Sequence, residues 1–593
     1  MAEKPHNFWE ELKRRKVIRV ITVYAAAAFV ILELVDIVSP ALGLPSWTMG
    51  FVIVLLCIGF IISTILSWVY DITPEGVQKT KSSTKDSQES KQPASIGWKI
   101  STYASLLIII AFVVFYIVSN IKQSSDISKL EKTIAVLPFD NMSTDQSYSY
   151  LGDAFTDEII LELQKIKEFD RVISRSSTMQ FKENRPTIPE IAEILGVNYL
   201  IEGAFQRHDE EVSIRIQVIR AEQEDHIWAD EYDGKWEEIF SIQDEIAFKV
   251  ANELKAVLSP GEIEQIEKKP TENSKAYEIY LLGRYNLSIG LEHNLLESIK
   301  YFQKALEYDS DYAMAYAGLA DAYASLGIFN IYSPEDTWPN ARAMANKALE
   351  LDEQIAEVYI SLLIIKMYYE YDWRGIENIF KKAIEINPNN SDAYAWYSMY
   401  LSAVGRHEEA LSHIEYALDI DPFSQFVKRN YFYVAFFAGQ KDKAWQLAQD
   451  EMITNAQYPY WLWRAAFYYA DLGNYPEAIS YIKKQISLMG NDINDAVGFL
   501  GYLYGRNGEP EKALQQLEKL DSISAIGRFV SPVNRTFIYI GLDEKQKAIE
   551  YLEDGFENKL FGSWLTACVN ELFVYDSIRD DPRFMELVSK MGL

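Results

Sequence analysis

The stretch SDAYAWYSMYLSAVGRHEEALSHIEYALDIDP, residues 391–422, decides the fold of most of this chain. Its apolar residues recur at helical spacing on both sides of a turn at Gly405, which predicts two helices. Ser398 in the first helix and Ala410 in the second are small enough to let the helices pack closely, and Pro422 ends the second helix. The stretch therefore predicts an antiparallel helix pair.

The same pattern recurs through the C-terminal half of the chain. A small residue returns every 34 or 35 residues, five positions after a turn residue. The alanines are Ala410, Ala444, Ala478, Ala513 and Ala548, and the turn residues are Gly405, Gly439, Gly473, Gly508 and Asp543. A constant period of this length indicates helix pairs stacked into a solenoid, whereas a generic helical bundle does not repeat.

The spacing within each copy resembles the tetratricopeptide repeat. Residues 313–352 and 357–388 match it as well, and weaker copies begin near residues 279, 425, 459, 494 and 529. We expect an all-α tetratricopeptide solenoid of about eight repeats over residues 275–565, followed by a capping helix over 566–593. The resemblance implies a surface for a protein or peptide partner.

The resemblance also implies where a partner would bind. In tetratricopeptide arrays, positions 2, 5, 9 and 12 of the first helix line the concave groove. In the copies that begin at 425 and 459, these positions hold Ala470 together with six aromatic residues and one arginine, which form the predicted patch. They are Phe426, Arg429, Tyr433, Phe436, Tyr460, Trp463 and Phe467. We predict a partner-binding groove here; the alternative is that these side chains pack against a neighbouring repeat or a folded-back C-terminus.

The charge of the chain is strongly acidic and unevenly distributed. The formal net charge is −29 over 593 residues, and all of the acidic excess lies after residue 119. No basic stripe matches the phosphates of a nucleic acid, so we expect no nucleic-acid partner. Cys57 and Cys568 are the only cysteines, and no cysteine and histidine cluster has the spacing of a zinc site.

Three apolar runs in the N-terminal fifth predict transmembrane helices. Residues 17–38, 47–70 and 100–118 are each about as long as a helix that spans a bilayer. We therefore expect a three-span module over residues 17–119. It would follow a short cytoplasmic N-terminus over residues 1–16.

Basic residues set the expected orientation of this module. They gather in residues 4–19 and in the linker over 71–97, whereas 39–46 carries none. The positive-inside rule then places the N-terminus and the linker in the cytoplasm. It places the later domains in the periplasm, or otherwise outside the bacterial inner (cytoplasmic) membrane. The roles of Glu33 and Asp36, two acids within the first run, are left open.

Segments around these runs resemble a membrane module that precedes tetratricopeptide arrays in many bacterial proteins. The matching segments are FWEELKRRKVIRV (8–20), PALGLPSW (40–47) and DITPEGVQK (71–79). Relatives with this layout include forms that carry a class III adenylate cyclase or a winged-helix DNA-binding domain. About 16 residues precede the first run, too few for either fold, so we expect neither output domain in this chain.

Residues 131–260 predict a compact α/β domain. Strands are expected at 134–139, 171–175, 199–205, 212–221 and 226–233, and helices at 155–166, 188–196 and 239–258. The runs AVLPFDNMS (135–143), LGDAFTDEI (151–159) and LGVNYLIEGAF (195–205) resemble the TolB amino-terminal-like domain. The resemblance implies a periplasmic, non-catalytic interaction domain and names no ligand.

Acidic residues gather at the start of the first expected helix of this domain. A cation site would use Asp153, Asp157 and Glu158, with Asp140 and Asp145 upstream. The favoured interpretation is that these acids lie near a helix N-terminus, where the helix dipole stabilises them. No serine, histidine or glycine-rich motif has the spacing of an active site. We therefore predict no catalytic residue, no metal site and no cofactor.

The predicted function is partner binding. We expect a membrane-anchored scaffold or sensor of the bacterial cell envelope that binds a protein or peptide through the groove and the α/β domain. The alternative is the receptor half of a signalling system that acts on a separate cytoplasmic cyclase or regulator. An enzyme acting on the cell envelope is the least favoured class. The sequence predicts neither the identity of the partner nor the oligomeric state.

Overall fold

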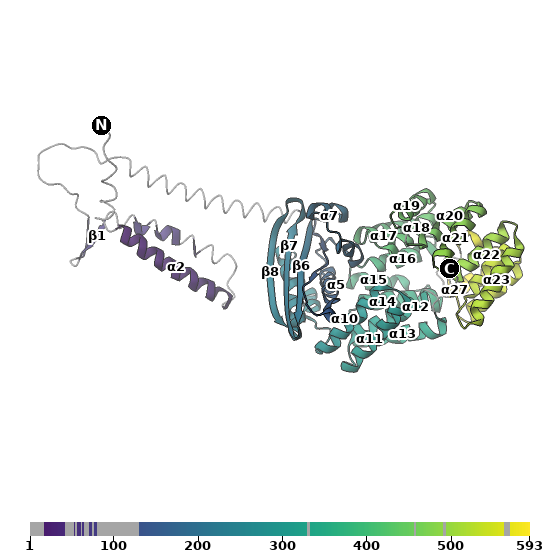
Figure 1. Ribbon diagram of the computed structural model, residues 1–593, viewed down its shortest axis with the longest axis horizontal. Coiled ribbons are helices and arrows are strands. Elements are labelled where there is room, and N and C mark those ends of the chain that lie inside the picture. Colours follow the sequence, from purple (N-terminus) through teal and green to yellow (C-terminus); the bar gives the residue numbers. More distant parts are fainter. Residues whose placement is uncertain are drawn as a thin grey trace, which may run out of the picture. The chain divides into compact units, whose positions relative to one another are not determined.

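The computed structural model describes residues 17–41, parts of 52–79, and 130–593 with four short gaps (Figure 1). The gaps are 329–331, 456–457, 490–493 and 562–569. The chain divides into two compact units, Met1–Asp126 and Ile127–Leu593.

The described part of the first unit contains one long helix, further helical residues between 52 and 64, and one hairpin. Helix α2 spans Val17–Ala41, and strands β1 (Tyr70–Thr73) and β2 (Gly76–Lys79) pair antiparallel. The apolar run at 100–118 lies outside the described residues, as do residues 1–16 and most of the linker, and the run at 47–70 is described only in part.

The prediction of a three-span membrane module is wrong. In the part of the chain that the structure describes, no helix combines the length and the apolar character needed to cross a bilayer. Helix α2 itself carries Arg19, Glu33 and Asp36, ionisable groups that are costly in hydrocarbon. The fold class is a mostly helical solenoid with a small sheet domain. The sequence predicted a location in the bacterial inner membrane with periplasmic C-terminal domains. That prediction depended on these spans and is therefore wrong as well.

The second unit begins with a six-stranded mixed sheet. Its main path runs β5-β3-β6-β7-β8, and a short strand, β4, pairs with β6. The strands are β3 (Thr133–Val136), β4 (Asp140–Asn141), β5 (Arg171–Val172), β6 (Tyr199–His208), β7 (Glu211–Arg220) and β8 (Asp225–Lys235). Strand β3 pairs parallel with β5 and β6, whereas β6, β7 and β8 form an antiparallel meander.

Helices cover both faces of the first strands because successive side chains of a strand point to opposite faces. Ile134 and Val136 pack under α5 (Leu151–Gln164) and α8 (Ile239–Glu253). Ala135 and Leu137 pack on the other face with α7 (Ile188–Leu195). The short helices α6 (Arg175–Thr178) and α9 (Pro260–Glu267) complete the sheet domain. The five predicted strands and three predicted helices recur at similar positions, whereas β4, α6 and α9 were not predicted.

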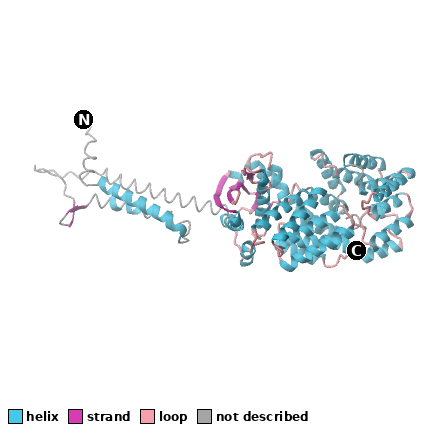
Figure 2. Ribbon diagram, turned by 60° about the horizontal axis from the view of Figure 1, so that its bottom comes forward, coloured by secondary structure: helices cyan, strands magenta, loops and turns pink. Residues whose placement is uncertain are grey.

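The rest of the unit is a solenoid of helices, and Figure 2 shows helices and loops but no strand among its described residues. The described residues form eight helix pairs. These are α10 (Ser274–Ile289) with α11 (Glu292–Tyr308), α12 (Ala313–Ile328) with α13 (Pro334–Leu351), α14 (Ala356–Ile365) with α15 (Ile376–Ile386), α16 (Ser391–Ala403) with α17 (His407–Ile420), α18 (Gln425–Phe437) with α19 (Lys441–Thr454), α20 (Tyr460–Asp471) with α21 (Tyr475–Met489), α22 (Asn494–Arg506) with α23 (Pro510–Ala525), and α24 (Pro532–Gly541) with α25 (Lys545–Glu557). Helix α27 (Pro582–Met591) follows the last pair.

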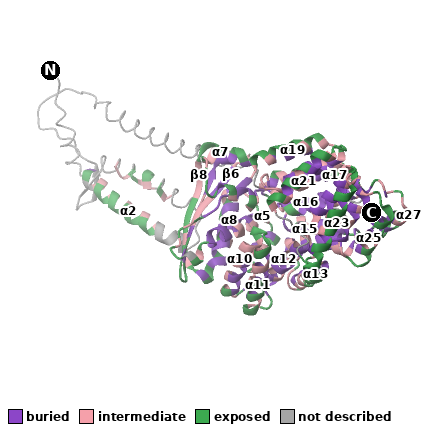
Figure 3. Ribbon diagram, turned by 45° about the vertical axis from the view of Figure 1, so that its right-hand side comes forward, coloured by how far each residue is buried: buried purple, intermediate pink, exposed green. Residues whose placement is uncertain are grey.

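The repeated small residues do what the spacing predicts. The five alanines that mark the period are fully buried, which leaves room for the facing helix. The turn residue Gly473 has a φ of 73°, a left-handed conformation that ends the first helix of its pair. Figure 3 shows buried residues concentrated between the helices and exposed residues on the outward face of helices such as α13.

The sheet domain packs directly on the solenoid. Apolar residues of α5 and α8 share one continuous core with α10, α11 and α12. Further along the array, the carboxylate of Asp421 accepts hydrogen bonds from the hydroxyls of Ser176 and Ser177. The backbone N–H of Val172 donates to Oδ1 of Asn389 over 3.0 Å. The contacts with Asp421 and Asn389 hold the edge of the sheet domain against the loops that follow α15 and α17.

Candidate partner-binding cleft

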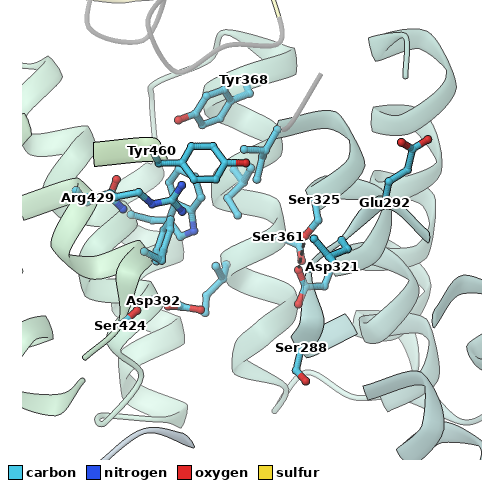
Figure 4. A pocket seen from close by; sticks show the side chains of 18 of the residues that line it. Ser288, Glu292, Asp321, Ser325, Ser361, Tyr368, Asp392, Ser424, Arg429 and Tyr460 are labelled. Carbon is cyan, nitrogen blue, oxygen red and sulfur yellow. Dashed lines mark hydrogen bonds between the residues drawn. The ribbon is translucent and has the colours of Figure 1, made fainter. Parts of the chain in front are cut away.

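One large cavity lies along the concave face of the solenoid, with a volume of about 1350 Å³. Its lining includes side chains from the first helices of seven successive pairs, α10, α12, α14, α16, α18, α20 and α22. Helices α5 and α6 of the sheet domain also contribute to it. Figure 4 shows the two groups of side chains that face the cavity from these helices. We refer to this cavity as the cleft.

One wall of the cleft is formed by aromatic and arginine side chains on two neighbouring helices. We call this set the aromatic–arginine wall: Phe426, Arg429 and Tyr433 on α18, and Tyr460, Trp463 and Arg464 on α20. Five of the seven residues that the sequence predicts for the groove belong to it. The ring of Phe426 packs against Trp396, with centroids 5.0 Å apart, so the wall continues onto α16.

The wall holds its two arginines against aromatic faces. The guanidinium of Arg429 lies 5.2 Å from the ring centroid of Tyr460, and the two residues are adjacent in Figure 4. The guanidinium of Arg464 lies 5.0 Å from the ring centroid of Tyr433. Stacking of this kind stabilises a cation beside a ring and keeps its N–H groups in a fixed plane.

Arg464 was missed by the sequence pattern because it lies one residue beyond the lining position held by Trp463. Only 7% of its surface is exposed, yet it lines the cleft. Burial lowers the pKa of its guanidinium to about 10, because removal from water disfavours the charged form, and Arg429 nearby adds like-charge repulsion. Arg464 is therefore a buried cation, and neighbouring protein groups offset little of the cost of removing its charge from water.

Another part of the lining is acidic and hydroxylic. We call Asp321, Glu357 and Asp392, with Ser325 and Ser361, the acidic wall. Figure 4 shows Asp321, Ser325 and Ser361 across the cleft from Arg429, and Asp392 nearer Ser424. Burial within the cleft, together with the neighbouring carboxylates, raises the pKa of Asp392 to about 7. The same lining positions that located Arg429 also locate two of these acids. Asp321 is position 9 of the copy beginning at 313, and Asp392 is position 2 of the copy beginning at 391.

Two residues of the predicted groove lie in the core instead. Phe436 and Phe467 are 4% and 1% exposed, and their ring centroids are 5.1 Å apart. Phe467 also contacts Phe573 of the C-terminal segment, with centroids 4.9 Å apart. These two residues therefore follow the alternative interpretation of the sequence. They pack against a neighbouring repeat and a C-terminal segment that folds back. They support the wall from behind and do not line the cleft.

The acids at the start of α5 do not converge on one point. Asp153 pairs with Lys182 over 2.6 Å, and Asp157 pairs with Arg284 over 3.2 Å. Among the residues that the structure describes, no group of three or more His, Cys, Asp or Glu side chains is placed to hold a metal ion. The cluster seen in the sequence is thus divided between ion pairs with different elements.

Two parts of the chain match known families. Residues 130–249 match the second domain of HilA/YgeH-like transcriptional regulators, and residues 379–412 match the tetratricopeptide repeat. The second match agrees with the repeat predicted from the spacing. The first covers the sheet domain and names a different family from TolB, so the TolB-like resemblance is not confirmed.

The chain resembles two curated proteins in amino-acid sequence. It is 34% identical over 212 residues to "Putative adenylate cyclase 3" of Rhizobium meliloti, across 35% of this chain and 34% of that protein. It is 28% identical over 145 residues to the transcriptional regulator HilA of Salmonella typhimurium, across 24% of this chain and 26% of that protein. The chain thus spans about a third or less of the length of these relatives.

Solved helical repeat proteins resemble the chain only weakly. Yeast Tom70 aligns with a TM-score of 0.35 and 16% identity, across 60% of this chain and 82% of that one. The type IV pilus biogenesis factor PilW aligns with a TM-score of 0.28 and 19% identity, across 34% of this chain and 92% of that one.

Proposed function

We propose that this chain is a scaffold that binds a protein partner by holding an extended peptide segment in the cleft. The observation that carries the proposal is the aromatic–arginine wall, where Phe426, Tyr460 and Trp463 face one continuous cavity. Aromatic and arginine side chains in partly buried pockets supply most of the binding energy of protein interfaces. Stacked tetratricopeptide helix pairs support the same class of function, because such arrays present a concave binding surface.

The size of the cleft favours a peptide over a small molecule. Its volume of about 1350 Å³ exceeds the ~300–1,000 Å³ typical of small-ligand pockets. Its lining extends from α10 to α23, across seven helix pairs. An extended polypeptide would contact the successive helices along this length.

We assign the chain no chemistry of its own. The similarity to a protein named as an adenylate cyclase covers only about a third of each sequence. We propose that the shared part binds partners and that any catalytic activity of that relative resides in the part that is not shared. Fold alone does not transfer an activity, because function depends on the residues of a site.

A second candidate is the regulatory half of a signalling system that acts on a separate cyclase or transcriptional regulator. Similarity to one protein named as a cyclase and to one transcriptional regulator favours it. The test is cyclic-nucleotide production by a cyclase encoded beside this chain, measured with and without the purified full chain. A rate that is unchanged at saturating chain excludes that cyclase as the target.

The main proposal is tested by affinity selection of a random peptide library on the full chain. Tyr460→Ala and Phe426→Ala should each weaken binding of the selected peptides by about tenfold or more, the usual cost of truncating an interface hot spot. Their melting temperatures should change little because both side chains are only partly buried. Leu514→Ala, at an exposed residue of α23 outside the cleft, is the matched control and should bind normally. Peptides that bind all three variants as they bind the native chain would contradict the proposal.

A further inference from the structure

The two edges of the mixed sheet differ in length and in what covers them. Strand β5 is two residues long, and the solenoid covers it. The backbone N–H of Val172 donates to Oδ1 of Asn389 over 3.0 Å, and that of Ser174 donates to the carbonyl of Ile420 over 3.1 Å. At the opposite edge, β8 is eleven residues long and, among the described residues, pairs with β7 alone (Figure 1). The backbone of β8 is therefore available on its outer side.

A hydrogen bond at the end of β8 shows which of its residues face outward. Successive residues of an edge strand turn their N–H and C=O groups alternately toward the neighbouring strand and away from it. The N–H of Trp236, directly after β8, donates to the carbonyl of Glu210 over 2.8 Å, in register with the ladder to β7. Even-numbered residues over 228–236 thus face β7. The outward-facing residues are Ala229, Glu231, Asp233 and Lys235.

Nearby side chains occupy only part of this outward row. The N–H of Glu231 donates to Oδ1 of Asp230 over 3.0 Å, and the N–H of Lys235 donates to Oε2 of Glu238 over 2.8 Å. Asp230 and Glu238 are exposed, so another backbone can displace their carboxylates. Between these two N–H groups, that of Asp233 has no partner within the described residues. The row is open to a strand that approaches from outside the sheet.

The sequence of β8 lacks the features that usually prevent a long edge from pairing. Proline, a bulge or a lysine in the middle of the strand commonly protects such edges. Residues 228–235 contain no proline, and their register with β7 is unbroken, because the one register shift lies opposite Val218 and Ile219. Lys235 is at the end of the strand. What remains to select a partner is the charge of the edge.

That charge is negative. Strand β8 carries four acids and one lysine, and three of the acids lie within residues 230–233. Glu231 pairs with Arg215 of β7 over 2.8 Å. Asp230 and Asp233 are exposed and form no ion pair within the described part of the chain. Opposite charges on facing strands stabilise a sheet, whereas like charges destabilise it.

We propose that β8 is a docking edge for an extended, basic segment of a partner protein, which adds to the sheet as a further strand. Backbone hydrogen bonds to the outward-facing residues supply the attachment. Lysine or arginine at alternate positions of the added strand faces Glu231 and Asp233. A second copy of this chain is the wrong occupant, because β8 against β8 would place acids beside acids. The described lining of the cleft includes no residue of β8, so this surface is additional to the proposed peptide site.

Two short peptides test the docking edge on the full chain. The probe is threonine-lysine-valine-lysine-valine-lysine-threonine with acetylated and amidated ends. The control peptide has the same sequence with N-methyl groups on the backbone of every lysine and valine, which keeps the charge and removes the N–H donors. Isothermal titration should show the probe binding about tenfold or more tightly than the control peptide, because only the probe can extend the ladder. Hydrogen exchange should slow at residues 225–235 when the probe binds and stay unchanged in α18 and α20.

Charge reversal on the edge gives the matched variants. Asp233→Lys should weaken binding of the probe about fivefold or more, because it places like charges on facing strands. Glu307→Lys is the control, since Glu307 is an exposed acid of α11 in the solenoid, and it should bind the probe as the native chain does. Both variants change the net charge of the chain equally, so general attraction of a basic peptide affects them alike. Both should melt near the native temperature because the two positions are exposed.

Four outcomes would overturn the inference. Equal binding of the probe and the N-methylated peptide would mean that charge alone holds them. Slower exchange in α18 or α20 without any change at 225–235 would place the probe in the cleft, which leaves the proposed function standing and removes the docking edge. Dimers of the free chain that the probe dissociates, seen by sedimentation velocity, would make a second copy the occupant of β8. Absence of binding to the native chain would refute the docking edge and leave the cleft untouched.

Discussion

Gly473 and Asp543 form the same left-handed turn with different residues. Their φ angles are 73° and 61°, and each lies between the two helices of a repeat. A Cβ built on Gly473 meets nothing within 4 Å, so packing does not require the glycine. The requirement is the backbone conformation, which glycine adopts without cost and a residue with a Cβ adopts less readily.

Exchanging these residues should therefore change stability in opposite directions. Gly473→Ala should lower the free energy of unfolding by about 1 kcal/mol, and Asp543→Gly should raise it by about 0.5 kcal/mol, since aspartate tolerates this region better than alanine does. Urea unfolding of the full chain measures both changes. A stabilising alanine at 473 would contradict the explanation of the turn.

Glu158 is a residue whose ionisation should oppose folding near neutral pH. Burial raises the pKa of its carboxyl to about 8, and Arg284 lowers it less than burial raises it. Its Oε1 is buried without a hydrogen-bond partner in the described structure. Because this pKa lies above that of the unfolded chain, the folded state binds an extra proton, and stability is lost as pH rises from about 4.5 to about 8.

Glu158→Gln should remove that part of the pH dependence. The amide resembles the protonated acid, so the variant and the native chain should unfold at similar temperatures at pH 5. At pH 8 the variant should be the more stable of the two by several degrees, because it avoids ionisation at a buried site. The comparison is made by calorimetry across this range. A difference in melting temperature that stays constant with pH would show that Glu158 keeps an ordinary pKa.

The contact between α6 and the loop after α17 joins two elements far apart in the sequence. Asp421 is 3% exposed and accepts hydrogen bonds from Ser176 and Ser177. The backbone N–H of Phe423 donates to the hydroxyl of Ser177 over 2.9 Å, which extends the same network. Removal of a buried acceptor leaves its donors unsatisfied.

Asp421→Ala should therefore destabilise the docking of the sheet domain by ~1–3 kcal/mol, the usual cost of an unsatisfied buried group. Limited proteolysis should cut between the sheet domain and the repeats faster in this variant than in the native chain. Asp419→Asn, an exposed neighbour, is the control and should be neutral. Equal proteolysis of all three proteins would mean that the apolar core shared by α5 and α10 alone holds the domain in place.

The local spacing of apolar and small residues predicted the helices and turns of the repeats well, because each of them depends on residues close in the sequence. The left-handed turn at Gly405 and the buried face around Ala410 follow from spacing within one repeat. The burial of Phe467 could not be predicted in this way, because it depends on Phe573 returning from more than 100 residues away. Asp421 was missed for the same reason, since its partners lie in another domain.

The candidate site was predicted in outline only. Transfer of the lining positions found Arg429 and Tyr460 but missed Arg464, which enters the cleft from the position next to Trp463. The apolar N-terminal runs led to a membrane location that the described helices do not support. An apolar run is necessary for a helix that spans a bilayer, but it is not sufficient. Whether a helix can span also depends on its length and on the charged residues within it.

At the scale of the whole molecule, the distribution of charge agrees with a binding function. The chain carries a net charge of −29, yet the aromatic–arginine wall places two arginines inside the cleft. A local concentration of positive charge on an acidic chain gives a charge pattern that a partner can complement. The sheet domain contributes α5 and α6 to the same cleft, so it takes part in forming the site as well as in docking on the array.

The central claim, that a peptide binds in the cleft, is tested most directly by site-specific photocrosslinking. A benzophenone amino acid is placed at Phe426 in the cleft, or at Leu514 on the exposed surface of α23, in the full chain. Peptides selected on the native chain are then irradiated with each protein and the adducts are identified by mass spectrometry. The account predicts crosslinks from position 426 that excess unlabelled peptide abolishes, and none from position 514. Crosslinks of equal yield at both positions, or at 514 alone, would contradict it.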